Sequence, residues 1–405
     1  MHLEHYRCFR NLKISFDDRL TVLIGENGAG KTAVLDSLSI YLQVASQSAQ
    51  PYIPIRDIMI NSKPSDIIFN FEISGLHDAL ADKTSQIEFS YDRTISDAIV
   101  MKTATETGVP NKKITPLFVS YMARRSIPEE EGINAPPEGA AFANNFKRTI
   151  DYSSTIHWFN NADADEARAM RDGQKSESPE LSAVRYALSK ALLGQYERPR
   201  MIGSPPELIL YRKGTDIYYK VSQLSDGYRV MLALVMDLAR RMAQTSHDCG
   251  KSGEQLLHVP AIVLIDEVEL HLHPSWQKTV LTTLMEIFQN TQFIVTTHSP
   301  QVLTSIPSKH IRILSDGKAH IVDEQTEGAE SSRVLENILG VEQRPEKLSI
   351  VQTLETYKKL VYDEKWDTAE AEQLRKKLVN HYGNDEPELE RLELHIENAK
   401  WERGL

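Results

Sequence analysis

Residues 25–32 read GENGAGKT and have the residue types that bind a phosphate group. They fit the spacing G-x-x-x-x-G-K-[ST], in which glycines let backbone N–H groups approach an anion closely. Lys31 would then reach the β- and γ-phosphates of a nucleotide, and the Thr32 hydroxyl would bind Mg²⁺. A glycine-rich turn could carry the same letters by chance, so the flanking sequence must decide between the two interpretations.

The flanking sequence favours phosphate binding. An apolar run at residues 20–24 predicts a buried strand, and helical spacing follows from residue 33 to about residue 44. A strand, a glycine-rich loop and a helix in this order is the context that the motif requires. The N-terminus of the helix adds partial positive charge beside the phosphate. The residues that we expect to bind the nucleotide are Asn27, Gly28, Ala29, Gly30, Lys31, Thr32 and Ala33.

A second apolar run, residues 262–265, ends in two adjacent carboxylates, Asp266 and Glu267. Carboxylates at the end of a buried strand need a cation or solvent nearby to offset their desolvation. Asp266 could hold Mg²⁺ through water, as a partner of Thr32 in the metal site. Glu267 could polarise an attacking water as a general base. The sequence therefore predicts the means to hydrolyse a nucleotide.

Two further segments add polar groups at the ends of predicted elements. Residues 224–229 read LSDGYR and place Ser225 and Gly227 at the start of a predicted helix, which is a ready anion site. A capped helix start would explain the same letters. His298 follows the predicted strand at residues 293–296, about 30 residues after the acid pair. A single histidine is usually an ordinary residue, but this position favours a functional one.

Between these segments lies a possible zinc motif. Glu269, His271 and His273 are spaced as an acid followed by His-x-His. No additional ligand pair has zinc-like spacing, which favours a non-metal role for this loop. The two cysteines, Cys8 and Cys249, share no metal-ligand spacing and cannot form a disulfide framework. Their number favours a reducing compartment.

The order of these motifs resembles that of ABC-type ATPases in the group that includes the OLD, RecF and Rad50 ATPases (AAA_21). The resemblance rests on GENGAGKT, LSDGYR, the string DEVELHLHP and FIVTTHSP, and it covers residues 1 to about 325. It implies ATP and Mg²⁺ as cofactors, with Lys31, Glu267 and His298 as catalytic residues. It also implies a homodimer or higher homo-oligomer, in which Ser225 and Gly227 cap the γ-phosphate held by a second copy. The loop at residues 269–273 would correspond to the D-loop that links the two sites.

The resemblance extends to the N-terminus, with departures elsewhere. Residues 6–10 read YRCFR and correspond to a turn near the adenine, which implies roles for Arg7 and Arg10. Asp226 and Tyr228 replace the usual Gly and Gln of the signature loop, a variant that the group tolerates. A Q-loop glutamine is not identifiable. Long heptads and an acidic nuclease domain are absent from the sequence.

We expect an α/β fold with an ABC-type P-loop core at residues 1–127 and 181–325. Its mixed, mostly parallel sheet would be flanked by helices and joined by an antiparallel side sheet. Residues 128–180 are polar and would form an inserted lobe, partly loop and partly helix. Strands are predicted at residues 67–73, 86–91, 116–121, 207–211, 217–221, 261–265, 293–296, 310–314 and 319–323. Helices are predicted at residues 181–193, 227–242 and 274–289.

The tail, residues 330–405, is predicted to form three helices and carries 17 acidic against 12 basic residues. Its apolar stripes could pack on the core or dock a partner. It resembles the tail of the stand-alone ATPases of Septu-type anti-phage systems, which also occur in some retron operons. That resemblance implies a small HNH-type nuclease as partner, regulated through the nucleotide state of this chain. Nucleic acid would then be reached through the complex.

Composition limits the other function classes. The net charge of −11 argues against a protein that coats nucleic acid, so the alternative is a RecF-like repair ATPase that clamps DNA through a local basic groove. A transporter motor does not suit the acidic tail. A plain nuclease would need a carboxylate cluster outside the ATP site. No apolar run approaches a membrane span, and we expect a cytoplasmic protein.

Overall fold

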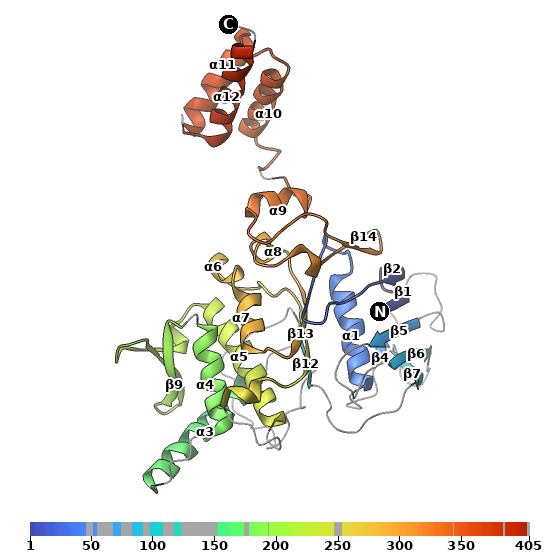
Figure 1. The fold of residues 1–405 in the computed structure, drawn as a ribbon, viewed down its shortest axis with the longest axis vertical. Coiled ribbons are helices and arrows are strands. Elements are labelled where there is room, and N and C mark those ends of the chain that lie inside the picture. The colour runs from blue at the N-terminus through green and yellow to red at the C-terminus, as the bar shows by residue number, and fades with distance from the viewer. Residues whose placement is uncertain are drawn as a thin grey trace. The chain divides into compact units, whose positions relative to one another are not determined.

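Figure 1 shows the computed structural model of the chain. The structure describes residues 1–45, 52–54, 68–73, 83–91, 98–107, 117–122, 152–173, 178–192, 194–246, 253–342, 344–383 and 385–402. The first residue of the strand predicted at residues 67–73 lies outside these ranges. Residues 128–151 and 174–177 of the lobe predicted at residues 128–180 also lie outside them. The chain divides into two compact units, Met1–Val334 and Leu335–Leu405.

A six-stranded sheet forms the centre of the first unit, in the order β15-β14-β3-β13-β12-β8. Its strands are β3 (Leu20–Ile24), β8 (Leu117–Tyr121), β12 (Ala261–Ile265), β13 (Thr291–Thr296), β14 (Ile311–Ser315) and β15 (Lys318–Ile321). All neighbours are parallel except β14 and β15. Every residue of β3, β8 and β12 is buried, because helices cover both faces of a parallel sheet.

Two antiparallel sheets flank this core. One has the order β2-β1-β5-β6-β7-β4 and the other β11-β10-β9. Their strands are β1 (His2–Tyr6), β2 (Phe9–Lys13), β4 (Tyr52–Pro54), β5 (Ile68–Ile73), β6 (Lys83–Tyr91), β7 (Ala98–Thr107), β9 (Tyr196–Ile202), β10 (Glu207–Arg212) and β11 (Tyr218–Lys220). The predicted α/β class, with a mixed, mostly parallel sheet and an antiparallel side sheet, is confirmed. Strands β4, β7 and β9 fall in stretches where no strand was predicted, and in β9 the residues YERPRMI lack an apolar alternation.

The helices of the first unit are α1 (Lys31–Ala45), α3 (Tyr152–Arg171), α4 (Pro179–Ala191), α5 (Asp226–Thr245), α6 (Pro274–Gln277), α7 (Val280–Ile287) and α8 (Pro300–Leu303). Helix α9 (Ser331–Asn337) begins in the first unit and ends in the second. In Figure 1, α1 lies on one side of the central sheet and α5 and α7 on the other. The single helix predicted at residues 274–289 is interrupted. The Thr279 N–H bonds to the Trp276 carbonyl three residues back (3.0 Å), which ends α6 before α7 begins.

A buried polar network joins α5 to the edge strand β8. Asp237 is completely buried and accepts hydrogen bonds from Tyr121 (2.8 Å), Thr155 (3.1 Å), Arg240 (3.1 Å) and Arg241 (2.7 Å). Burial acts to raise the pKa of this carboxyl, but the guanidinium of Arg241 and the other donors hold the pKa below its ordinary value. The helix is therefore anchored by an ionised carboxylate.

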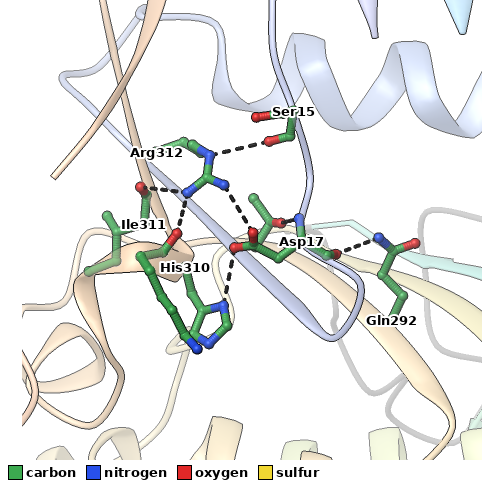
Figure 2. A network of polar contacts seen from close by, with 8 residues as sticks. Ser15, Asp17, Gln292, His310, Ile311 and Arg312 are labelled. Atoms are coloured by element: carbon green, nitrogen blue, oxygen red, sulfur yellow. Dashed lines mark hydrogen bonds and ion pairs between the residues drawn. The ribbon is translucent and has the colours of Figure 1, made fainter. Parts of the chain in front are cut away.

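A second network, shown in Figure 2, joins the amino ends of β3, β13 and β14. The Asp17 carboxylate accepts from Arg312 (3.2 Å) and lies 3.1 Å from Nδ1 of His310. The backbone carbonyl of Asp17 accepts from the Gln292 side chain (2.6 Å). These contacts hold the strands together at the edge opposite their carboxyl ends, which frees the carboxyl ends to carry functional groups.

The second unit consists mainly of α10 (Ser349–Tyr362), α11 (Ala369–Tyr382) and α12 (Pro387–Glu402). The predicted helical extension is therefore confirmed. The three helices share a small core made of Leu354, Tyr357, Val361, Ala371, Leu378, Leu389 and Leu392. Across the part of the chain that the structure describes, no helix has the length and apolarity to cross a bilayer.

Candidate nucleotide site

The loop between β3 and α1 has the conformation that its glycines permit. Gly25, Gly28 and Gly30 have φ values of 148°, 87° and 97°, which side-chain-bearing residues rarely adopt. The Ala29 N–H bonds to the Glu26 carbonyl (3.1 Å), so the loop turns back on itself before the helix begins at Lys31. The predicted strand–loop–helix is present, and the backbone can present N–H groups to an anion.

Gly30 also has a packing requirement that the motif does not reveal. A Cβ atom on this residue would lie 2.3 Å from Cζ of Phe9 and 2.6 Å from Sγ of Cys8. Phe9 begins β2, directly after the turn that joins β1 to β2. The N-terminal hairpin is therefore packed against the glycine-rich loop of residues 25–32.

The Lys31 side chain lies along the loop. Its Nζ donates to the carbonyls of Gly25 (2.8 Å) and Glu26 (2.9 Å), and the residue is buried. Burial lowers the pKa of this ammonium, whereas the negative charges of Asp266, Glu267 and Glu269 act in the opposite direction. A buried cation is thus held between the loop and a group of carboxylates.

Thr32 and Asp266, predicted to share a metal ion, lie together. The Thr32 hydroxyl lies 3.1 Å from Oδ2 of Asp266, although 234 residues separate them in the sequence. The Thr296 hydroxyl donates to the other oxygen, Oδ1 of Asp266, at 2.6 Å. Hydroxyl and carboxylate oxygens are the ligands that Mg²⁺ prefers, so Thr32 and Asp266 fit a magnesium ion.

Glu267 follows at the carboxyl end of β12 with φ of 48°, an uncommon value outside glycine. Its N–H donates to the Thr296 hydroxyl (2.7 Å), and the N–H of Val268 donates to the Thr296 carbonyl (3.0 Å). Strand β13 thus fixes the backbone on which the Glu267 carboxyl is carried. Thr296 serves both acidic residues, and sequence reasoning missed it. The sequence signal that could have identified Thr296 is its position directly before Thr297 and His298 at the end of a predicted strand.

His298 lies beyond the end of β13 and is exposed. Its backbone N–H donates to Oε1 of Glu269 (2.6 Å), and the Thr297 hydroxyl donates to Oε2 of the same carboxylate (2.7 Å). Glu269 therefore connects the loop after Glu267 to the residues around His298. The sequence marked Glu269 only as a neighbour of the two histidines, so this role was missed.

The LSDGYR segment begins α5, with Ser225 as the N-cap residue. Ser225 and Asp226 are exposed, and the Ser225 side chain makes no capping hydrogen bond. Gly227 is closely packed, since a Cβ atom there would lie 2.6 Å from the carbonyl oxygen of His271. The segment thus presents a helix N-terminus outward while its glycine rests on the loop that carries Glu269.

The remaining predicted positions have other surroundings. Arg7 forms an ion pair with Asp36 of α1 (2.7 Å) and lies over the Tyr6 ring, and Arg10 is exposed. His273 is the N-cap of α6, where Nδ1 lies 2.9 Å from the Ser275 hydroxyl. Within the described ranges, no group of three or more His, Cys, Asp or Glu side chains is placed to hold a metal ion.

Two protein families match the chain. "AAA domain, putative AbiEii toxin, Type IV TA system" matches residues 124–304, and "AAA ATPase domain" matches residues 1–183. The chain is therefore similar to AAA-type ATPase domains over residues 1–304, and this similarity supports ATPase activity in general terms.

Individual relatives are similar at modest identity. "Retron Ec83 probable ATPase" of Escherichia coli is 29% identical and covers 99% of this chain and 87% of that protein. "Septu protein PtuA" of Bacillus mycoides (strain KBAB4) is 23% identical over 78% of this chain and 40% of that protein. Among solved structures, an SMC head domain from Thermotoga maritima aligns with a TM-score of 0.44 and 17% identity, over 80% of this chain and 97% of that chain.

Proposed function

We propose that this chain binds ATP with Mg²⁺ at the loop of residues 27–33 and hydrolyses it. The observation that supports this most directly is the 3.1 Å contact between Thr32 and Asp266, beside the buried Lys31 ammonium. Two oxygens that suit a magnesium ion and one buried cation are thereby collected at one strand-loop-helix junction. All the predicted catalytic residues belong to segments at the carboxyl ends of the parallel strands or next to them.

In this proposal each residue of the site has a separate role in binding or hydrolysing ATP. The loop amides and Lys31 bind the phosphates, and Lys31 exchanges its two loop carbonyls for phosphate oxygens. Thr32 and Asp266 hold Mg²⁺, which neutralises charge on the phosphates when bound. Glu267 accepts a proton from water as general base, with its backbone fixed by Thr296. His298 is the group that contacts the γ-phosphate.

A second copy of the chain would complete the site. In this proposal two chains associate head to tail, so that Ser225 and Gly227 of one cap the ATP of the other. The exposed Ser225 at the N-terminus of the 20-residue helix α5 supports this arrangement. Such a helix end carries unpaired N–H groups and a partial positive charge, which suit a γ-phosphate. Hydrolysis is expected to be slow.

Glu267→Gln is expected to bind ATP but to accumulate as an ATP-bound dimer, because the general base is lost and the pocket is kept. Light scattering with and without ATP measures the mass, and phosphate release measures turnover. Lys31→Ala is the control that should neither bind ATP nor dimerise. An unchanged mass together with wild-type turnover in Glu267→Gln would refute the assignment. A wild-type chain that binds no ATP would refute the function as a whole.

We further propose that the ATPase belongs to an anti-phage defence complex and regulates an HNH-type nuclease subunit. The support is the similarity to the retron ATPase and to Septu protein PtuA, together with the resemblance of the tail. The second unit also exposes apolar side chains that a partner could cover. Leu394 and Trp401 are 58% and 83% exposed, and their spacing of seven residues places them on one face of α12.

A further inference from the structure

The carboxylate of Glu269 uses both of its oxygens to hold the backbone around His298. One oxygen accepts from the His298 N–H (2.6 Å) and the other from the Thr297 hydroxyl (2.7 Å). The Thr297 oxygen in turn accepts from the Ser299 N–H (3.0 Å). A charged acceptor makes such hydrogen bonds stronger than neutral ones. Three successive residues at the end of β13 are thus ordered from one side chain.

The loop of residues 269–273 also contacts the LSDGYR segment, residues 224–229, which we call the signature turn. A Cβ atom on Gly227 would lie only 2.6 Å from the carbonyl oxygen of His271, so the turn and the loop are in close contact. His271 itself has φ of 67°, an uncommon value for a side-chain-bearing residue, which shows that the loop is bent sharply at this point. Within one short segment, Glu269 therefore contacts His298 and His271 contacts the signature turn.

A second connection runs in parallel. The Gln277 side chain donates to the Leu272 carbonyl (2.9 Å), and the Ser299 hydroxyl donates to the Gln277 side-chain oxygen (2.7 Å). Leu272 and Ser299 belong to the two segments that Glu269 already joins. The loop and the residues after β13 are thus linked at two points, which favours their movement as one piece.

We propose that Glu269 is a positioning residue that fixes His298 from the loop on which the signature turn of the same chain packs. This rests on the proposed function, in which His298 contacts the γ-phosphate of the chain's own ATP. Glu269 itself touches neither phosphate nor metal in this proposal and acts on turnover through His298.

Steady-state kinetics provide the first test. Glu269→Ala is expected to lower kcat about tenfold to hundredfold with little change in KM, because two charge-assisted hydrogen bonds are lost away from the binding loop. Glu269→Gln keeps one acceptor for the His298 N–H and is expected to recover most of the activity. Glu327→Ala, which removes an exposed acid elsewhere, is the matched control and should match the wild type. Equal loss in the Gln and Ala variants would overturn the proposal.

A double-mutant cycle separates positioning from a general structural role. If Glu269 acts through His298, its removal should change kcat less than twofold in a His298→Ala background. Additive losses would show that Glu269 acts elsewhere. A lower thermal midpoint alone would not produce this non-additivity.

Hydrogen exchange gives a readout that does not depend on turnover. The His298 amide should exchange at least about tenfold faster in Glu269→Ala than in the wild type, because its acceptor is gone. Unchanged exchange would sink the proposal even if ATP is hydrolysed. If the wild-type chain neither binds nor hydrolyses ATP but exchange at His298 responds as expected, the proposed function fails and the positioning contact stands.

Discussion

At the residue scale, Asp266 is held by Thr32 of the glycine-rich motif and by Thr296 and Tyr121, which lie outside it. Its side chain is 4% exposed and contacts the hydroxyls of Thr32 and Thr296, while its N–H donates to the Tyr121 carbonyl (2.8 Å). A buried carboxylate without such donors would be costly. The motif supplies the residue type, and the neighbouring strands supply the position.

Gly30→Ala should destabilise the fold more than Gly28→Ala. Both glycines have positive φ, so alanine at either site is expected to cost about 1–2 kcal/mol of backbone strain. Only at Gly30 would the new Cβ meet Phe9 and Cys8, which adds about 1–3 kcal/mol of overpacking, whereas nothing lies within 4 Å at Gly28. Denaturant unfolding of the two variants measures the difference. Equal free energies of unfolding would show that the N-terminal hairpin accommodates the added methyl group without loss of stability.

The residue types of the candidate site could be predicted from the sequence, but their supports could not. Lys31, Thr32 and Asp266 are specified by local spacing, and the structure brings them together. Glu269 acquires its partners 28 and 29 residues away, through the parallel pairing of β12 with β13. Its role is therefore a tertiary contact with no local pattern.

At the scale of elements, α5 links the signature turn to the strands beside the acid pair Asp266 and Glu267. Its N-terminus is the signature turn, and its middle is anchored through Asp237 to Tyr121 on β8. Tyr121 is the residue whose carbonyl accepts from the Asp266 N–H. Burial raises the pKa of the Tyr121 hydroxyl well above its ordinary value, so it stays a donor to Asp237. The network fixes the helix relative to the strand that carries the acid pair.

Asp237→Ala is expected to reduce the free energy of unfolding by about 3–5 kcal/mol, because it leaves Arg241 buried without its carboxylate. Asp226→Ala on the same helix is the matched control. Asp226 pairs with Arg229 at the surface, so its loss should cost about 0–1 kcal/mol. Urea titrations of both variants make the comparison. A small effect at Asp237 would show that the arginines find solvent or other acceptors.

The same carboxyl predicts a pH dependence. Since the pKa of Asp237 in the folded chain lies below its ordinary value of 3.8, its contribution to stability is present above that pH. The contribution falls as the pH drops below 3.8 through the lowered pKa of the folded state. The stability difference between the wild type and Asp237→Ala should therefore shrink on the acid side of pH 3.8.

The elements that could be predicted are those with a strong apolar pattern. Strands β3 and β12 are continuous apolar runs, and their predicted bounds agree with the structure. Strand β9 escaped prediction because its buried Pro199 lies among charged residues and its pairing is decided by β10. The interruption between α6 and α7 depends on a bond within the turn and on Trp276 packing against Tyr228, which periodicity does not contain.

At the scale of the whole molecule, the division into two units separates two kinds of task. The proposed ATP site lies within Met1–Val334, and Leu335–Leu405 has its own apolar core. Ion pairs such as Lys358–Glu388 (3.1 Å) add contacts between its helices. Since the described residues of the ATP site find their support in the first unit, the second is free for a separate task, which we propose is partner binding.

Deleting residues 335–405 should remove binding of the proposed HNH-type nuclease subunit while ATP binding survives with about the same Kd. The reason is that the second unit carries its own core and contributes none of the predicted ATP-binding residues. Co-purification of the two subunits and ATP titration of residues 1–334 measure the two effects. A sharper variant is the pair Leu394→Ala and Trp401→Ala in the full chain, which removes exposed side chains and should leave unfolding unchanged. If the truncated chain still retains the nuclease, docking belongs to the first unit, and if truncation abolishes ATP binding, the two units are not independent.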